Sequence, residues 1–155
     1  MEAFCDSDYA GDSESRKSIL GYVIYFCGCA VAWKSHGQKS VSLSSTEAEY
    51  KAILEVVTDV LFVKMLLEFF GFEVKLPIQI KVDNVGAIYL ARSAGSTGRT
   101  KHIDIHHHYV RDYIEDGIVK IKFVRSKQNN ADIFTKNLNE ELFTKHRDTI
   151  MGNKE

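Results

Sequence analysis

A chain of 155 residues has the length of one domain, and its formal net charge of −1 provides no overall field that would attract nucleic acid or an anionic membrane. A polyanionic partner must therefore be held by a local patch or by metal ions. Three cysteines are too few for a disulfide framework, so we expect reduced thiols in an intracellular protein. Asp59, Lys64 and Glu68 interrupt the most apolar run, which argues against a membrane span.

The pattern of apolar and turn-forming residues predicts nine elements in the order β-β-β-α-β-α-α-β-α. Their predicted bounds are strands 2–10, 19–27 and 29–34, a helix from 44 to about 71, a strand 78–82, helices 85–92 and 101–116, a strand 118–124, and a last helix from 131 to about 151. A hairpin followed by alternating helices and strands predicts an α/β fold, with a mixed five-stranded sheet and helices packed on it.

The longest predicted helix carries an acid in its first turns. Ser44 is a good N-cap, and Glu47 three residues later can close a capping box. Apolar residues from Ala48 to Phe70 recur at helical spacing and predict a broad buried face. Because Glu47 is used in the cap, Glu49 is left as a second carboxylate near the start of a buried helix.

Three further acids lie at comparable places. Asp6 is inside the first strand, Asp83 follows the strand 78–82, and Asp132 is in the first turn of the predicted last helix. If these three carboxylates and Glu49 converge, they repel one another unless divalent cations lie between them, and hard oxygen ligands suit Mg²⁺ or Mn²⁺. Taken singly, each acid is explained as well by a helix cap, a turn or an exposed surface position.

Two other groups of residues have both a functional and a structural interpretation. His102 and the run 106–108 could bind zinc, because His102 and His106 share a helical face, or they could be structural or contact a substrate. Cys27 and Cys29 flank a hairpin turn, where a redox role competes with ordinary packing.

The chain resembles a known family in several motifs. They are CDSDYAGD (5–12), RKSILGYV (16–23), VAWKSHGQKSVSLSSTEAEYKA (31–52), KVDNVGAIYLA (81–91), RTKHIDIHHHYVRD (99–112) and NNADIFTKNL (129–138). Together they are similar to the ribonuclease H domain at the C-terminal end of the polyprotein of copia-type retrotransposons. The resemblance covers essentially the whole chain, and it implies one ribonuclease H-like domain over residues 1–155. The implied fold is a five-stranded mixed sheet in the order 3-2-1-4-5 with helices on both faces.

The resemblance also implies an activity, the hydrolysis of the RNA strand of an RNA–DNA hybrid. The family's four catalytic acids correspond to Asp6, Glu49, Asp83 and Asp132. Asp6 would bridge two Mg²⁺ ions, which Mn²⁺ can replace, with Glu49 and Asp83 on one ion and Asp132 on the other.

Contacts to the nucleic-acid backbone and the biological context follow from the same resemblance. The residues expected to contact the backbone are Ser44, Ser45, Thr46, Asn84 and Lys101. The implied partners are the RNA–DNA hybrid and the reverse transcriptase domain of the same polyprotein, in the cytoplasm, a virus-like particle or the nucleus.

Two other functions compete with this interpretation. The chain could be a catalytically silent remnant that binds hybrids or has a structural role, although drift would have no reason to keep all four acids. It could also be another nuclease or an integrase of the same superfamily, which SSTEAEY and ADIFTK argue against. The loop 126–130 contains no histidine, so a histidine proton shuttle from that loop is not expected.

Overall fold

The computed structural model describes residues 1–93 and 101–152, with side chains described in the second range from residue 108 onward. The strands are β1 (Glu2–Asp8), β2 (Ile19–Phe26), β3 (Cys29–Gly37), β4 (Ile78–Val82) and β5 (Val119–Phe123). The α-helices are α1 (Ser45–Phe69), α2 (Val85–Arg92), α3 (Lys101–Glu115) and α4 (Glu140–Met151). Two short 3₁₀ helices, η1 (Ser126–Gln128) and η2 (Asn130–Phe134), precede α4.

The strands form one mixed sheet in the order β3-β2-β1-β4-β5, as the family resemblance implied. β2 is antiparallel to β1 and to β3, whereas β4 is parallel to β1 and to β5. The parallel ladder between β1 and β4 is short, and its last pair joins Phe4 to Lys81. The two strands therefore stop pairing two residues before Asp6 and Asp83.

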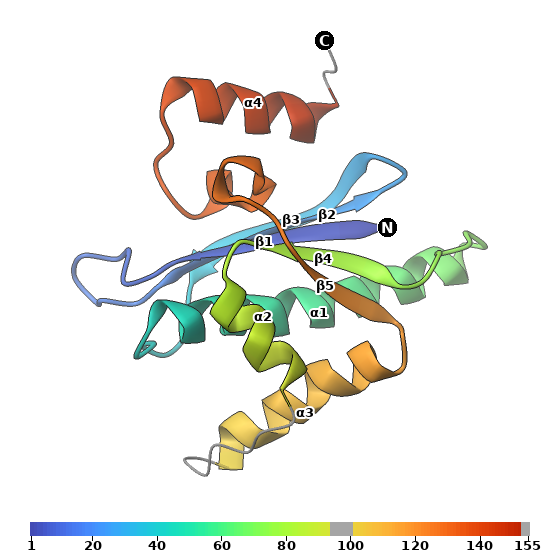
Figure 1. Cartoon of the computed structure of the whole chain (residues 1–155). Coiled ribbons are helices and arrows are strands. Elements are labelled where there is room, and N and C mark those ends of the chain that lie inside the picture. The colour runs from blue at the N-terminus through green and yellow to red at the C-terminus, as the bar shows by residue number, and fades with distance from the viewer. Residues whose placement is uncertain (94–100, 153–155) are drawn as a thin grey trace.

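Helices cover both faces of the sheet, which was also implied. Figure 1 shows α1, α2 and α3 on one face and α4 on the other, with η2 between α4 and the sheet. Alternation along the strands sends Ala3 and Cys5 into the larger core under α1 to α3, and Phe4 into a smaller core that includes Ala131 of η2. Among the described residues, no helix is long and apolar enough to cross a bilayer.

The start of α1 agrees with its sequence signals. The Ser44 hydroxyl accepts a hydrogen bond from the backbone N–H of Glu47, at 3.1 Å, which confirms the predicted N-cap. The Glu47 carboxylate accepts from the backbone N–H of Leu43, at 2.8 Å, one residue before the group that a capping box would use. Glu47 thus stabilises the helix start, and Glu49 is free for another role.

The prediction that the apolar face of α1 stays buried as far as Phe70 is wrong for the last turn of the helix. Full burial ends at Val60, and Leu61, Val63 and Leu67 are partly buried against the core. Phe70, the residue that caps the helix, is 69% exposed. The reason is geometric, because a helix of 25 residues is roughly 37 Å long. The strands of five to nine residues cover only about 17–30 Å.

The prediction of one continuous last helix from residue 131 is also wrong. The 3₁₀ helix η2 ends at Phe134, and α4 begins only at Glu140. Each has its own cap, since the Asn129 side chain accepts from the backbone N–H of Ala131 and the Asn139 side chain accepts from that of Leu142. Asp132 therefore lies in a short separate helix, not in the first turn of the last one.

Candidate active site

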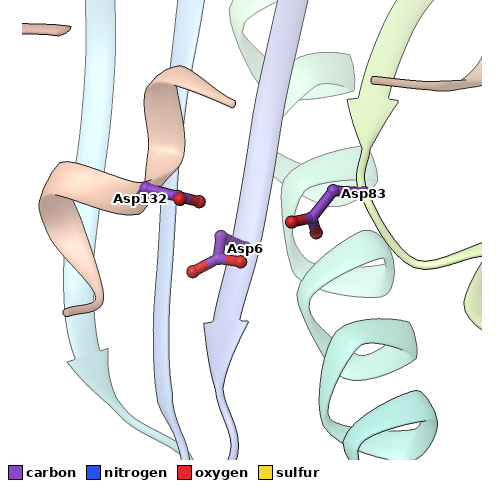
Figure 2. A group of neighbouring side chains, drawn as sticks. All are labelled: Asp6, Asp83 and Asp132. Atoms are coloured by element: carbon purple, nitrogen blue, oxygen red, sulfur yellow. The ribbon is translucent and has the colours of Figure 1, made fainter. Parts of the chain in front are cut away.

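Three of the four predicted acids meet at the centre of the sheet. Asp6 comes from β1, Asp83 follows the end of β4, and Asp132 comes from η2. Each offers a carboxylate oxygen, and these oxygens all lie within 4.8 Å of one another. Figure 2 shows the Asp6 side chain between those of Asp83 and Asp132. The arrangement joins residues that are far apart in the chain, so it depends on the whole fold.

The sheet itself positions Asp6 and Asp83. Both residues lie two positions beyond the last β1–β4 pair, Phe4 with Lys81, and so at the point where the two parallel strands no longer pair. In open α/β sheets, ligands bind beyond the carboxyl ends of the strands where neighbouring strands diverge. The predicted position of Asp83 at such an end is confirmed.

Two adjacent asparagines place η2, and with it Asp132, against the sheet. The Asn129 side chain donates to the backbone carbonyl of Cys5 at 3.0 Å, next to Asp6. The Asn130 side chain donates to the Tyr25 hydroxyl at 3.3 Å, and its carbonyl lies 3.1 Å from Nδ1 of the buried His146. These bonds connect η2 to β1, β2 and α4, which explains why Asp132 is held in place without a long helix.

A glycine in β2 allows η2 to approach closely. Gly21 pairs with Asp6 across the β1–β2 ladder. A Cβ atom at Gly21 would lie 2.7 Å from side-chain atoms of both Phe134 and Thr135, nearer than such atoms approach in proteins. The missing side chain thus leaves the space in which η2 lies beside Asp6.

Glu49 adjoins the three aspartates from the α1 side of the sheet. It is 6% exposed and stands outside the set of three whose oxygens are mutually within 4.8 Å. Burial, and then the charges of Asp6 and Asp83, raise the pKa of Glu49 to about 9, while a hydrogen bond from the Ser7 backbone opposes this shift. Its Oε2 atom finds no hydrogen-bond partner among the described residues. A buried carboxylate oxygen without a partner is the kind of atom that a cation would satisfy.

Two residues that sequence reasoning did not assign contact this cluster. The Thr135 hydroxyl donates a hydrogen bond to Asp6 Oδ2. Lys136 Nζ lies 3.2 Å from Asp6 Oδ2 and 3.4 Å from Asp132 Oδ1. Both belong to the run ADIFTK, from which only Asp132 had been assigned. The helical offset of four residues between Asp132 and Lys136 was a usable signal for an ion pair.

The electrostatics of the cluster are unfavourable without a further cation. Burial raises the pKa of Asp6, and Lys136 and Thr135 act against that rise. Burial and the charge of Asp6 raise the pKa of Asp132 to about 7. One lysine therefore does not compensate the buried carboxylates, and their convergent oxygens fit a divalent cation, which prefers carboxylate ligands.

Two of the residues predicted to contact the nucleic-acid backbone have structural roles. Ser44 caps α1, and the Asn84 side chain caps α2 by accepting from the Ala87 backbone. A Cβ atom at Gly86 would lie 2.9 Å from Thr46 Oγ1, so the first turns of α1 and α2 touch. Ser45, the first residue of α1, is exposed there. The predicted contact through the side chain of Lys101 falls outside the described residues.

The zinc site considered for the histidines and the redox role considered for the cysteines remain predictions. His108 Nδ1 lies 2.6 Å from Arg111 Nη2, and the side chains of His102, His106 and His107 lie outside the described residues. Cys27 and Cys29 are exposed free thiols at the hairpin between β2 and β3.

The sequence is similar to those of transposon polyproteins. No family model matches the chain. It is 37% identical over 136 residues, 88% of its length, to the retrovirus-related Pol polyprotein from transposon TNT 1-94 of Nicotiana tabacum. It is 34% identical over 143 residues, 92% of its length, to that from transposon RE2 of Arabidopsis thaliana. The chain spans about a tenth of the length of each of these relatives, 10% in both cases.

Solved structures with the same fold are ribonucleases H. The N-terminal RNase H domain of rv2228c from Mycobacterium tuberculosis matches over 96% of both chains, with a TM-score of 0.61 and 8% identity. LC11-RNase H1, solved in complex with an RNA/DNA hybrid, matches over 86% of this chain and 92% of that one, with a TM-score of 0.61 and 12% identity. At such identities the likeness establishes the fold alone. Fold and sequence together show that the chain has the ribonuclease H fold and belongs to the Pol polyproteins of copia-type retrotransposons.

Proposed function

We propose that this domain hydrolyses the RNA strand of RNA–DNA hybrids, with divalent cations held by Asp6, Glu49, Asp83 and Asp132. The observation that carries the proposal is the convergence of three aspartate oxygens within 4.8 Å, beside a buried glutamate whose pKa is raised to about 9. Its support from the comparisons is the ribonuclease H fold and the similarity to Pol polyproteins. One neighbour in fold, LC11-RNase H1, was solved with an RNA/DNA hybrid.

The four acids fit two cations of the Mg²⁺ or Mn²⁺ type. Such cations, when bound, supply an activated water and neutralise charge on the scissile phosphate. Asp6, which lies between the other two aspartates, is suited to share its carboxylate between the two cations (Figure 2). Asp83 and Glu49 would hold the cation on one side of Asp6, and Asp132 the cation on the other side.

Other residues orient the acids and the substrate. Thr135 and Lys136 fix the Asp6 carboxylate through their contacts with its oxygens. The first turns of α1 and α2 lie side by side, and helix N-termini bind phosphate groups through their free backbone N–H groups. We assign Ser45 and Thr46 there to contacts with the nucleic-acid backbone. We assign Glu49 to a contact with a 2′-hydroxyl, the group that distinguishes RNA from DNA.

The context of the relatives supports a second partner, the reverse transcriptase domain of the same polyprotein. The chain matches only 10% of each relative, so in those proteins the matched segment works beside a much longer chain. Because the net charge is −1, we expect the isolated domain to bind a hybrid weakly and its activity to rise when it is joined to the polymerase. Low salt and Mn²⁺ should favour its activity.

The test is cleavage of a hybrid whose RNA strand is end-labelled, in Mg²⁺, in Mn²⁺ and in a chelator. Duplex DNA and duplex RNA of the same sequence serve as control substrates, and Asp6→Asn serves as the control for contaminating nuclease. We expect metal-dependent cleavage of the RNA in the hybrid alone. If the domain binds the hybrid but fails to cut it, even when fused to its polymerase and supplied with Mn²⁺, it is a silent binding module.

A further inference from the structure

A second polar site lies beside the carboxylate cluster, on the face of the sheet that carries η2 and α4. It is a cavity of about 440 Å³ over β4 and β5, near the edge of the sheet. Three of its lining residues are the lysines Lys81, Lys122 and Lys145, and Asn130 and the aromatic rings of Phe4 and Phe123 also line it. Among the described residues, no aspartate or glutamate lines this cavity, which we call the lysine pocket.

The lysine pocket adjoins the acids through the chain itself. Phe4 and Lys81 lie two residues before Asp6 and Asp83. Two residues along a strand span roughly 6.6 Å, and strand alternation places residues two apart on the same face. Asn130 precedes Asp132 by the same number of residues in η2. A polynucleotide strand lying across the acids would therefore reach the pocket without a turn.

Contacts on the protein position two of the three lysine ammonium groups at the pocket. Lys81 Nζ lies 2.8 Å from Glu2 Oε2 and 4.5 Å from the centre of the Phe4 ring. Lys145 Nζ donates to the Lys127 carbonyl at 2.9 Å, a contact that leaves its charge uncompensated. In the described part of the chain, Lys122 forms no ion pair. After the Glu2 contact is counted, the pocket keeps an excess of positive charge.

We propose that the lysine pocket binds neighbouring backbone phosphates, one for each of Lys122 and Lys145, of the nucleic-acid strand that lies across the carboxylate cluster. This rests on the proposed function, because it assigns the same strand to both sites. The acids repel phosphate, and the whole chain carries a net charge of −1, so attraction must come from a local group of lysines. Phe123, 56% exposed beside Lys122, offers a ring on which a base or sugar can pack.

An acidic peptide is the other class of ligand that three lysines could hold. The position of the pocket favours nucleic acid, because Phe4, Lys81 and Asn130 connect it directly to the three aspartates. The exposed ring and the amide group fit a nucleotide as well as a phosphate.

The test compares the salt dependence of hybrid binding in wild type and in the double variant Lys122→Gln, Lys145→Gln. The control is Lys75→Gln, an exposed lysine before β4, at the end of that strand away from Asp83. Binding of a short fluorescent hybrid is measured by anisotropy in a chelator, so that nothing is cut. Loss of two phosphate contacts lowers the slope of log K against log salt by about 1.8. Between about 50 and 200 mM salt, wild-type affinity should fall about 12-fold more than that of the double variant.

The outcomes separate this inference from the proposed function. The control should keep the wild-type slope, and a thermal melt should show that every variant is folded. Lys122→Gln alone, which leaves the Lys145 contact intact, should lower the slope by about half as much.

A wild-type slope in both lysine variants overturns the proposal that the lysine pocket binds phosphate, whether or not the domain cuts a hybrid. A reduced slope supports the pocket even if the wild type proves unable to cut. If a glutamate-rich peptide binds the wild type as tightly as the hybrid does, and the double variant loses the peptide, the pocket is a protein-binding site and the proposal is wrong.

Discussion

Lys136 Nζ lies 3.2 Å from Asp6 Oδ2, and the Asp6 carboxylate that it contacts is only 1% exposed. The same ammonium group is 3.4 Å from Asp132 Oδ1. Lys136 thus places one positive charge between two acids that are proposed to share a cation. In the absence of metal this lysine partly compensates the cluster, and when metal is present it competes for the same oxygens.

Replacing Lys136 by Met should therefore have opposite effects on stability and on metal binding. In a chelator at alkaline pH, we expect the free energy of unfolding to fall by about 1–3 kcal/mol, since a buried carboxylate loses its partner. The lower end of that range is expected, because solvent screens the lysine side chain, which is 34% exposed. Affinity for Mn²⁺, measured by calorimetric titration, should rise because no ammonium group has to be displaced.

Lys120→Met is the matched control, an exposed lysine on β5 that does not contact the acids. If Lys136→Met melts like the wild type in a chelator and binds Mn²⁺ with unchanged affinity, Lys136 does not compensate the cluster.

The metal-free domain should lose stability as the pH rises. The pKa of Glu49 is raised from 4.5 to about 9, and that of Asp132 from 3.8 to about 7. The folded state then holds protons that the unfolded chain has released, so the stabilisation is complete below about pH 4 and is lost as the pH passes 7 and then 9. Between pH 7 and 9 the loss from Glu49 is about 2 kcal/mol. The measurement is urea unfolding in a chelator at these two pH values.

This comparison avoids the acidic range, where a histidine acts in the opposite direction. Burial lowers the pKa of His146, so the stability linked to it is present above its ordinary value of 6.5 and is lost as the pH falls. Addition of Mg²⁺ should reduce the alkaline loss, because the cation then compensates the ionised acids. Equal stability at pH 7 and 9 in a chelator would show that these carboxylates titrate normally.

Gly21→Ala should disturb the site without changing any acid. The added methyl would lie 2.7 Å from Phe134 Cβ and from Thr135 Cγ2, so η2 must move away from β2. We expect a cost of about 1–3 kcal/mol in stability and a weaker hold on Asp132, seen as lower Mn²⁺ affinity. Gly37→Ala in β3 is the control, since nothing lies within 4 Å of a Cβ atom there. Equal effects of the two substitutions would contradict this role of Gly21.

Sequence reasoning reached the sheet and its order because the strands alternate clearly and the motifs resemble one family. It placed Asp6 inside the first strand and Asp83 at the carboxyl end of the fourth strand for the same reason. It failed at residues 131–139, where apolar spacing looks helical. The break there comes from the separate side-chain caps at Asn129 and Asn139, which compete locally with a continuous helix.

The partners of the acids were less predictable than the acids themselves. Lys136 has a local signal in its spacing from Asp132, but its contact with Asp6 joins residues 130 positions apart. Asn129 reaches Cys5 across a similar separation, and the need for a glycine at position 21 depends on the approach of η2. Such contacts follow from tertiary packing, which no local pattern encodes.

Glu49→Gln tests the proposed catalytic role with least disturbance of the fold. At pH 7 a carboxyl group with a pKa of about 9 is protonated in the metal-free domain, so Glu and Gln are both neutral there. The amide oxygen of Gln can still accept from the Ser7 backbone, and Glu47, not Glu49, supports the start of α1. Stability in a chelator at pH 7 should nevertheless rise by roughly 3 kcal/mol, because the wild type releases the Glu49 proton on unfolding and the variant has no such proton.

Activity should respond strongly, because a neutral amide is a much poorer ligand for a divalent cation than a carboxylate. We expect transition-state stabilisation to fall by roughly 3–4 kcal/mol, or about 10²–10³ in rate, by analogy with other preorganised electrostatic groups. Hybrid binding in a chelator at pH 7 should persist, since Glu49 and Gln are both neutral there. The measurements are cleavage of a labelled hybrid in Mg²⁺, an anisotropy titration and a thermal melt. If the wild type cuts and Glu49→Gln cuts equally well, Glu49 is not a metal ligand, and the three aspartates must hold the cations without it.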